Sequence, residues 1–218
     1  MRKNRADWIL KWVRGPAVLD VGCTGHKVEL ASKYWVHGRL RQSFSHVVGI
    51  DVSEEKITQL QQQGFENLYV QSAETFSLNE QFDTIVAGEL IEHLAKPGNF
   101  LIQARKHMKQ NGRLILTTPY PFSIHYSLYA LWKYPRTCQN IEHTCWFCPQ
   151  TIRELAQRCG FDVQHFELIS DYRPENNPSL LYRLMVHTII ILAPLLPDQL
   201  KHNTMLVVLV PHEDLTNK

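Results

Sequence analysis

Short apolar runs alternate with helix-like patterns through the first two thirds of the chain, and this alternation constrains the fold more than any other feature. The apolar runs are bounded by turn residues, which is typical of buried strands, and the amphipathic segments between them are typical of helices. Strand–helix units repeated in this order wind a parallel sheet with helices on its faces. We therefore expect an α/β fold.

The expected elements follow from apolar spacing and from residues that begin or end helices. Strands are expected over residues 17–21, 47–51, 68–71, 82–87, 113–118, 161–169 and 205–210. Helices are expected from the cap Asn4 to Gly15, from the cap Ser53 to Gly64, from Pro97 to Gly112, and over residues 149–160. The buried faces of these helices would carry Trp8, Trp12, Val13, Ile57, Leu60, Phe100, Leu101, Ala104, Met108, Ile152, Leu155, Ala156 and Cys159.

Length and composition favour a single domain over residues 1–218. The alternation lapses from Pro119 to residue 148, and so long a connection in a compact domain is usually functional, which predicts a lid. Aromatic side chains are dense between Tyr120 and Tyr134. They either pack the lid onto the core or form a pocket for an aromatic or lipid-like molecule, completed by the run Leu184–Leu196 in a hydrophobic cap at 171–203.

Charge and hydropathy argue against several classes of protein. Lysine and arginine total 23 against 21 acidic residues, and no run of five basic side chains occurs, so nucleic-acid binding is not favoured. The run Leu184–Leu196 contains Pro194 and is too short to cross ~30 Å of hydrocarbon. Lys11 and Arg14 break the first apolar stretch before a signal peptide can form, and the cysteines are odd in number. We therefore expect a cytoplasmic protein with reduced thiols.

Four residues near the end of the expected lid could be drawn as a zinc site: Cys138, His143, Cys145 and Cys148. A structural zinc site usually has two well-spaced ligand pairs, and this segment has only one Cys-x-x-Cys. We therefore favour the alternative, in which the small cysteine side chains pack around Trp146 and Phe147.

The segment Val18–Gly25 (VLDVGCTG) predicts a ligand-binding loop. Asp20 lies near the end of a buried strand, and Gly22 and Gly25 let the main chain approach a polar ligand there. The next strand ends at Asp51, whose carboxylate can accept both hydroxyls of a ribose. The loop lacks the Gly-x-Gly-x-x-Gly pattern of dinucleotide sites, which argues against NAD. S-adenosylmethionine fits better, because it has no pyrophosphate and needs acceptors for its ammonium and its ribose.

In this order, the motifs resemble the class I S-adenosylmethionine-dependent methyltransferases of the type 11 subgroup, over about residues 15–170. The resemblance implies a Rossmann-like, doubly wound sheet of seven strands, mostly parallel, with an antiparallel last strand. The chain departs from the family pattern where Thr24 stands near the place of a central glycine. The cofactor-binding residues that the resemblance implies are Asp20, Gly22, Cys23, Gly25, Asp51, Val52, Ala73, Glu74, Gly88 and Glu89.

The resemblance also implies roles for these residues. Asp51 would hold the ribose, Val52 would pack on the adenine, and Ala73–Glu74 would bound the adenine's amino edge. Gly88 and Glu89 would lie near the methionine part. The alternative for each residue is structural, because Asp51 can cap the next helix and Glu74 can be solvated.

Glu89, Glu92 and His93 are spaced as i, i+3 and i+4, which project from one face of a helical turn. With His143 as a fourth ligand, they could bind a divalent cation such as magnesium, manganese or zinc. The pattern resembles ubiquinone-type O-methyltransferases and small-RNA 3′-terminal ribose methyltransferases. In the latter, the corresponding residues hold a magnesium ion at the acceptor's hydroxyls. The alternative needs no metal, because acidic side chains at a helix start interact favourably with the macrodipole.

Methyl transfer from a sulfonium is an in-line displacement, which needs alignment rather than a covalent nucleophile. An oxygen acceptor must lose a proton, so we predict His93 or His143 as a general base, or a cation that stabilises the charge. The favoured function is O-methylation of a small molecule. The other hypotheses are methylation of an RNA ribose 2′-oxygen, and a cofactor-binding partner subunit without acceptor chemistry.

Overall fold

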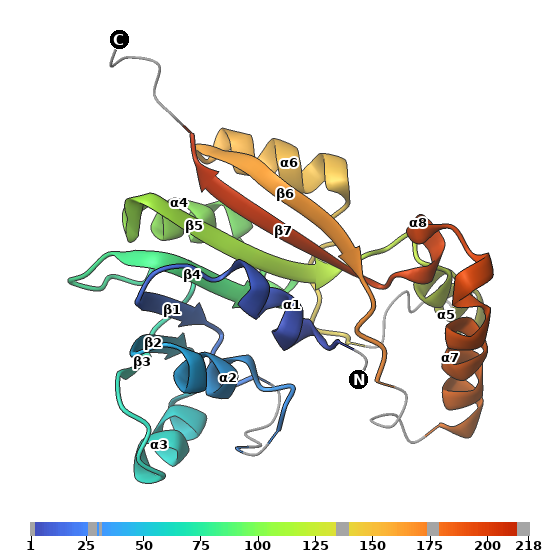
Figure 1. Cartoon of the computed structure of the whole chain (residues 1–218), viewed down its shortest axis with the longest axis horizontal. Coiled ribbons are helices and arrows are strands. Elements are labelled where there is room, and N and C mark those ends of the chain that lie inside the picture. The colour runs from blue at the N-terminus through green and yellow to red at the C-terminus, as the bar shows by residue number, and fades with distance from the viewer. Residues whose placement is uncertain (1–2, 26–29, 31, 134–139, 174–178, 213–218) are drawn as a thin grey trace.

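The computed structural model describes residues 3–25, 30, 32–133, 140–173 and 179–212, and these form a seven-stranded sheet (Figure 1). The strand order is β3-β2-β1-β4-β5-β7-β6, and β7 runs antiparallel to both of its neighbours. The strands are β1 (Ala17–Val21), β2 (His46–Asp51), β3 (Leu68–Val70), β4 (Phe82–Gly88), β5 (Met108–Pro119), β6 (Phe161–Ile169) and β7 (Thr204–Pro211). The expected mostly parallel sheet with an antiparallel last strand is confirmed.

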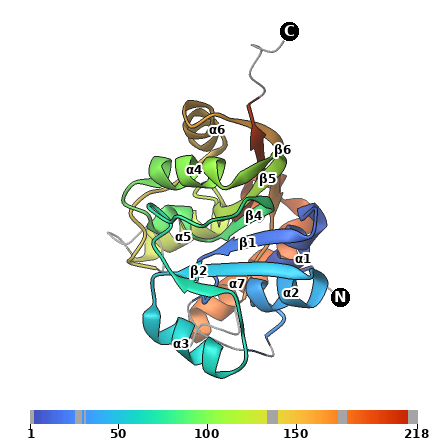
Figure 2. The same cartoon turned by 90° about the vertical axis from the view of Figure 1, so that its left-hand side faces the viewer.

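Helices cover both faces of the sheet, with α1 and α2 on one face and α4 and α6 on the other (Figure 2). Neighbouring residues of β1 show this, since Val18 belongs to the same buried cluster as Ile9 and Leu40, whereas Leu19 belongs to the cluster that contains Phe100 and Ile152. The helices are α1 (Arg5–Trp12), α2 (Val36–Ser43), α3 (Glu54–Gln62), η1 (Ile91–His93), α4 (Pro97–Lys106), α5 (Ile124–Lys133), α6 (Pro149–Arg158), α7 (Leu180–Leu192), η3 (Ala193–Leu195) and α8 (Asp198–Lys201).

The first helix begins as expected, and Val13 at its end is buried as expected, but its two tryptophans are not. The side chain of Asn4 accepts the N–H of Asp7 at 3.1 Å, and the Asp7 carboxylate accepts the N–H of Asn4 at 3.0 Å, which is a capping box. Ile9 is fully buried, whereas Trp8 and Trp12 are only half-buried. The two tryptophans therefore flank the packed face of α1 rather than form it.

The helix α4 ends before His107, so the expected continuation through Met108 is wrong. The Nδ1–H of His107 donates to the carbonyl of Gln103 at 2.8 Å, and Nε2 accepts the N–H of Leu78 at 2.9 Å. The carbonyl of His107 accepts the N–H of Phe82, which brings the chain into the sheet. Met108 then pairs with Phe82 as the first residue of β5, and β5 is longer than expected.

Both segments expected as lid and cap contain helices. Residues 119–148 include α5, and residues 171–203 include α7, η3 and α8. α5 contacts α7 and α8, and the three helices group beyond the carboxyl ends of β4 and β5 (Figure 1). The lapse in strand–helix alternation therefore marks helices that pack at the end of the sheet instead of on its faces. Tyr134 and Cys138, which the sequence analysis singled out, lie outside the described residues.

Candidate active site

A cavity of ≈ 980 Å³ opens at the carboxyl ends of the parallel strands. It lies where the strand order changes direction, because β2 and β3 follow β1 on one side while β4 and β5 lie on the other. Doubly wound sheets bind ligands at this point, since the loops leave the two neighbouring strands in opposite directions and a crevice remains between them. The cavity is lined in part by the loop after β1, by Asp51, by Gly88 and Glu89, and by the segment 140–143.

The loop after β1 is tied to β2 by its backbone. The N–H groups of Gly22 and Cys23 donate to one carbonyl of β2 at 2.8 and 3.2 Å, and the N–H of Thr24 donates to Asp51 at 3.2 Å. Gly22 and Gly25 have φ of +81° and +60°, a region that favours glycine. These three N–H groups are already bonded within the protein. They are therefore not available to donate to a ligand, although the loop does line the cavity, as its expected approach to a ligand requires.

Asp51, the expected ribose acceptor, also holds this loop. One carboxylate oxygen accepts the hydroxyl of Thr24 at 2.8 Å as well as its N–H, and the other accepts the N–H of Ser53 at 3.0 Å. A carboxylate has about four acceptor positions, so one remains for a ribose hydroxyl. Ser53 itself caps α3 through the N–H of Lys56, as expected. Asp51 therefore has both the structural role and a place on the cavity wall.

Asp20 lies on the cavity wall in a buried pair that the sequence analysis missed. Its carboxylate lies 3.1 Å from Nδ1 of His37, and the exposed fractions of the two residues are 3% and 0%. A carboxylate only accepts hydrogen bonds here, so Nδ1 of His37 carries the proton. Nε2 of His37 is buried without a hydrogen-bond partner among the described residues. No spacing rule connects these residues, because they meet only when α2 packs beneath the loop.

Three residues implied by the resemblance do not line the cavity: Val52, Ala73 and Glu74. Val52 is 70% exposed just past Asp51. Ala73 is buried in the core, and the carboxylate of Glu74 accepts the N–H of Lys96 at 2.9 Å, which ties the loop after β3 to the start of α4. The carboxylate of Glu74 therefore has a structural role. The roles of all three residues toward an adenine stay predictions.

Glu89 does not lie on the expected helical turn. Its φ is +54°, which is uncommon for a residue with a side chain, and the short helix η1 begins only at Ile91. Its carboxylate lies 3.6 Å from the guanidinium of Arg5, which in turn lies 3.7 Å from Asp171. The i, i+3, i+4 arrangement is therefore wrong for Glu89. The residue belongs to an ion-pair network with α1 and the end of β6 instead.

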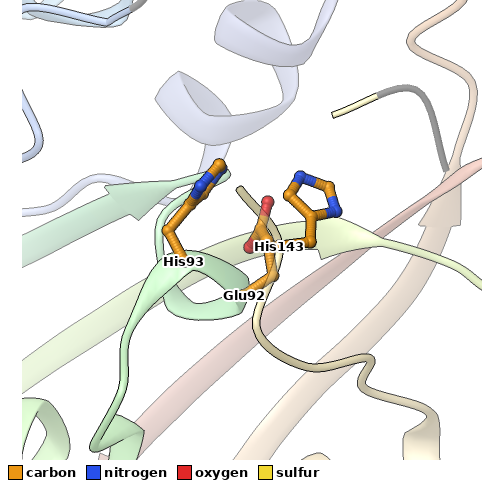
Figure 3. Close-up of side chains that lie close together, drawn as sticks. All are labelled: Glu92, His93 and His143. Atoms are coloured by element: carbon orange, nitrogen blue, oxygen red, sulfur yellow. The ribbon is translucent and has the colours of Figure 1, made fainter. Parts of the chain in front are cut away.

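The other three predicted metal ligands do come together (Figure 3). The N–H and hydroxyl of Thr144 donate to the carbonyl of Glu92 at 2.8 and 3.0 Å, which holds His143 beside η1. Ligand atoms of Glu92, His93 and His143 lie within 4.8 Å of one another, and the two imidazole centres are 4.7 Å apart. Within the described ranges, no other His, Cys, Asp or Glu joins a group with this spacing.

Glu92 is the buried member of this cluster, with an exposed fraction of 1%. Its Oε2 accepts the hydroxyl of Thr118 at 2.9 Å, and its Oε1 is buried without a hydrogen-bond partner in the described part of the chain. Burial and then the charge of Glu89 raise the pKa of Glu92 to about 8. A buried carboxylate oxygen beside two imidazoles fits a proton or a divalent cation as its missing partner.

The cysteines near His143 do not join this cluster. Cys138 lies outside the described residues, and Cys145 and Cys148 belong to no metal-ligating group within them. The thiol of Cys145 points to backbone carbonyls of η1, and Phe147 is buried. The packing interpretation fits these contacts better than the zinc site.

The sequence analysis also missed His125, which lines the cavity from α5. Its Nε2 lies 2.7 Å from the hydroxyl of Tyr182 on α7, and its Nδ1 is buried without a hydrogen-bond partner among the residues described. Burial lowers the pKa of His125 to about 4, so the imidazole is neutral near pH 7. A histidine within the aromatic stretch was the one sequence signal that could have indicated it.

The geometry agrees with the comparison to known families. A family model described as a methyltransferase domain matches residues 3–166, which is most of the chain. This chain belongs to the methyltransferase domain family. A comparison with curated protein sequences gives no match.

Solved methyltransferase structures share this fold. An S-adenosylmethionine-dependent methyltransferase from Archaeoglobus fulgidus has a TM-score of 0.65 at 17% identity, with 94% of this chain and 90% of that chain covered. One from Clostridium acetobutylicum has a TM-score of 0.60 at 12% identity, covering 95% and 90%. Magnesium protoporphyrin IX methyltransferase from Synechocystis PCC 6803, with bound S-adenosylhomocysteine, has a TM-score of 0.59 at 16% identity, covering 94% and 80%. At these identities the likeness concerns the fold.

The expected membership of a methyltransferase family is thus confirmed by the family model, and the expected fold by the solved structures. The subgroup and the likeness to its two branches stay predictions. Within the residues that the structure describes, no helix of this methyltransferase combines the length and apolar character needed to span a membrane.

Proposed function

We propose that this methyltransferase transfers a methyl group from S-adenosylmethionine to an oxygen atom of a small, aromatic or lipid-like molecule. The observation that carries the proposal is that one continuous cavity reaches from Asp20 and Asp51 to the cluster of Glu92, His93 and His143. A donor held at the first pair and an acceptor held at the second group would lie in the same cavity, which is the arrangement that an in-line displacement needs.

The cofactor end of the cavity offers two carboxylates. Both line the cavity. In the proposed complex Asp20 would accept the cofactor's ammonium, and the remaining acceptor position of Asp51 would accept a ribose hydroxyl. Gly22, Cys23 and Gly25 would form the wall against the cofactor, with Gly88 and Glu89 toward its methionine part. Val52 is exposed and could pack on the adenine.

The acceptor end supplies proton acceptors. In the proposed reaction, the acceptor oxygen bonds to the methyl carbon while the carbon–sulfur bond breaks and its electron pair stays on sulfur. S-adenosylhomocysteine and a methyl ether or ester are the products. The acceptor's proton passes to the imidazole of His93 or His143, the two residues that we propose as catalytic. The helices α5 and α7, which we propose as lid and cap, contribute His125, Tyr126 and Tyr182 to the cavity wall.

The cluster also fits a divalent cation, since Glu92 has an unpartnered buried oxygen beside two imidazoles. Magnesium or manganese held there would stabilise the charge on an acceptor hydroxyl. The ligands would be Glu92, His93 and His143, whereas Glu89 would keep its ion pair with Arg5.

Manganese is therefore expected to raise the melting temperature of the unaltered chain at pH 8, because an ion that binds only the folded state stabilises it. The variant His143→Ala should lose this shift. The exposed histidine His187 on α7 provides a matched control, since His187→Ala should keep the shift. The melting temperatures would be measured by differential scanning fluorimetry. If manganese shifts all three proteins equally, the cation site is excluded, and the general-base role of the histidines remains the proposal.

S-adenosylhomocysteine is expected to raise the melting temperature, whereas NADH is not. At a ligand concentration a hundred times Kd, the stabilisation would be about 2.7 kcal/mol. Asp51→Ala should reduce the shift, because it removes the ribose acceptor, while Asp162→Ala on β6 should keep it. Stabilisation by NADH in place of S-adenosylhomocysteine would refute the cofactor assignment.

Labelled S-adenosylmethionine and a fractionated cell extract would test the acceptor. We expect label in small molecules or lipids. Label in RNA, with a complex that weakens as salt rises, would favour the ribose 2′-O-methyltransferase hypothesis, which the same cluster supports. Stabilisation by S-adenosylhomocysteine with no transfer to any fraction would favour a non-catalytic partner subunit.

A further inference from the structure

The helix α7 has two apolar faces, and the described part of the chain covers only one of them. Val186 and Ile189 are buried on the covered face. Leu180, Leu184 and Ile191 are 68%, 56% and 74% exposed, and their spacing places them together on the opposite face. α7 lies at one end of the molecule (Figure 1). Single exposed leucines are ordinary, but several apolar side chains gathered on one face of such a helix indicate a binding surface.

Three exposed polar side chains on α5 and α7 are bonded to their own helices. The hydroxyl of Thr188 donates to the carbonyl of Leu184 at 3.0 Å, and Nδ1–H of His187 donates to the carbonyl of Arg183 at 2.6 Å. In α5, the hydroxyl of Ser127 likewise donates to the carbonyl four residues earlier at 3.0 Å. A polar group that is already hydrogen-bonded within its helix costs less free energy to transfer from water to an apolar phase. These side chains therefore suit a surface that faces an apolar phase.

The charges on these helices are all positive. Neither α5 nor α7 contains Asp or Glu, whereas α5 ends in Lys133 and α7 carries Arg183 near its start. The ammonium of Lys133 lies 4.3 Å from the ring centre of Trp132, which is 41% exposed. α5 and α7 contact each other. Exposed aliphatic side chains, a tryptophan and basic residues on neighbouring helices are typical of helices that lie on anionic membranes.

We infer that the exposed face of α7, together with Trp132 and Lys133 of α5, binds the surface of an anionic phospholipid bilayer. With 13 residues, α7 is about 20 Å long, so it can lie along a bilayer whose apolar core is ~30 Å thick but cannot cross it. The same two helices line the cavity through His125 and Tyr182. A membrane-bound chain would thus hold its cavity next to the lipid interface. This surface goes beyond the proposed function and does not depend on it.

Cosedimentation of the full chain with vesicles tests the inference. We expect binding to vesicles of phosphatidylcholine mixed with phosphatidylserine, weaker binding to phosphatidylcholine alone, and a loss of binding as salt rises, because salt screens Lys133 and Arg183. The double variant Leu184→Ser with Ile191→Ser should bind about a hundredfold more weakly, since each lost aliphatic side chain costs about tenfold. The control Val70→Ser with Ile102→Ser, at exposed positions on β3 and α4, should bind normally.

Several outcomes would overturn the inference. One is equal vesicle binding by the unaltered chain and the α7 double variant. Another is no vesicle binding at all. A dimer in size-exclusion chromatography that the α7 double variant dissociates, without vesicle binding, would assign the face to a second copy of the chain. The thermal shift with S-adenosylhomocysteine is a separate readout, so a failure of the proposed function would leave the vesicle result interpretable. The variant's circular dichroism spectrum would show that it is folded.

Discussion

Replacing Glu92 by glutamine is expected to make the metal-free protein more stable at pH 8, by an amount on the order of 3 kcal/mol, and to change its stability little near pH 5. Burial, with the charge of Glu89, raises the pKa of Glu92 from 4.5 to about 8. Between these values the folded state holds a proton that the unfolded state has released. The free energy of unfolding therefore falls as pH rises through this window. Glutamine carries no charge, and its Oε1 can still accept the hydroxyl of Thr118.

Urea denaturation from pH 5 to pH 8 in a chelating buffer would measure this difference. The control is Glu66→Gln, at an exposed position after α3. Its free energy of unfolding should differ from that of the unaltered chain by an amount that does not change with pH. A flat difference for Glu92→Gln as well would contradict the buried, proton-binding carboxyl. The same variant should lose methyl transfer to an oxygen acceptor if Glu92 supports His93 and His143 there, so the fold would gain stability while the site loses function.

The second large effect is expected at Asp20. Asp20→Ala would leave the buried Nδ1–H of His37 without its acceptor and should lower the free energy of unfolding by about 3 kcal/mol. His37→Phe should also destabilise the protein, because it leaves the Asp20 carboxylate buried and unpaired. The double variant should lose less free energy of unfolding than the two single variants lose in sum, because it removes both partners and leaves neither one buried without a hydrogen bond. If the losses of the two single variants add up to the loss of the double variant, the interaction between Asp20 and His37 does not stabilise the fold.

Asp20→Asn separates the structural role from cofactor binding. Its side-chain oxygen can still accept from His37, so we expect a smaller loss of stability than for Asp20→Ala. Its negative charge is gone, so the affinity for S-adenosylhomocysteine, measured by calorimetry, should fall about tenfold or more, as expected for a lost charge-assisted contact. An unchanged affinity would mean that Asp20 only positions His37 and the loop.

Local rules were sufficient for most elements and failed at identifiable places. The strands, and the caps Asn4 and Ser53, depend on neighbours in the sequence, so their patterns were readable. Met108 continued an apolar helical spacing, but the helix ends before His107, where the imidazole accepts the N–H of Leu78, and that contact is not local. Glu89 had the spacing of a helical ligand, yet its backbone takes a left-handed conformation that no periodicity indicates.

The sequence by itself determined the doubly wound sheet, the predicted ligand-binding loop that ends at Gly25, and the candidate cluster residues Glu92, His93 and His143. It could do so because strand burial, helix caps and motif spacing are properties of short segments. Only the tertiary structure decided which side chains meet. The bonds of Thr144 to Glu92 bring His143 into the cluster, and α1 brings Arg5 between Glu89 and Asp171. Contacts between residues so far apart in the chain depend on how whole layers pack, which no local pattern encodes.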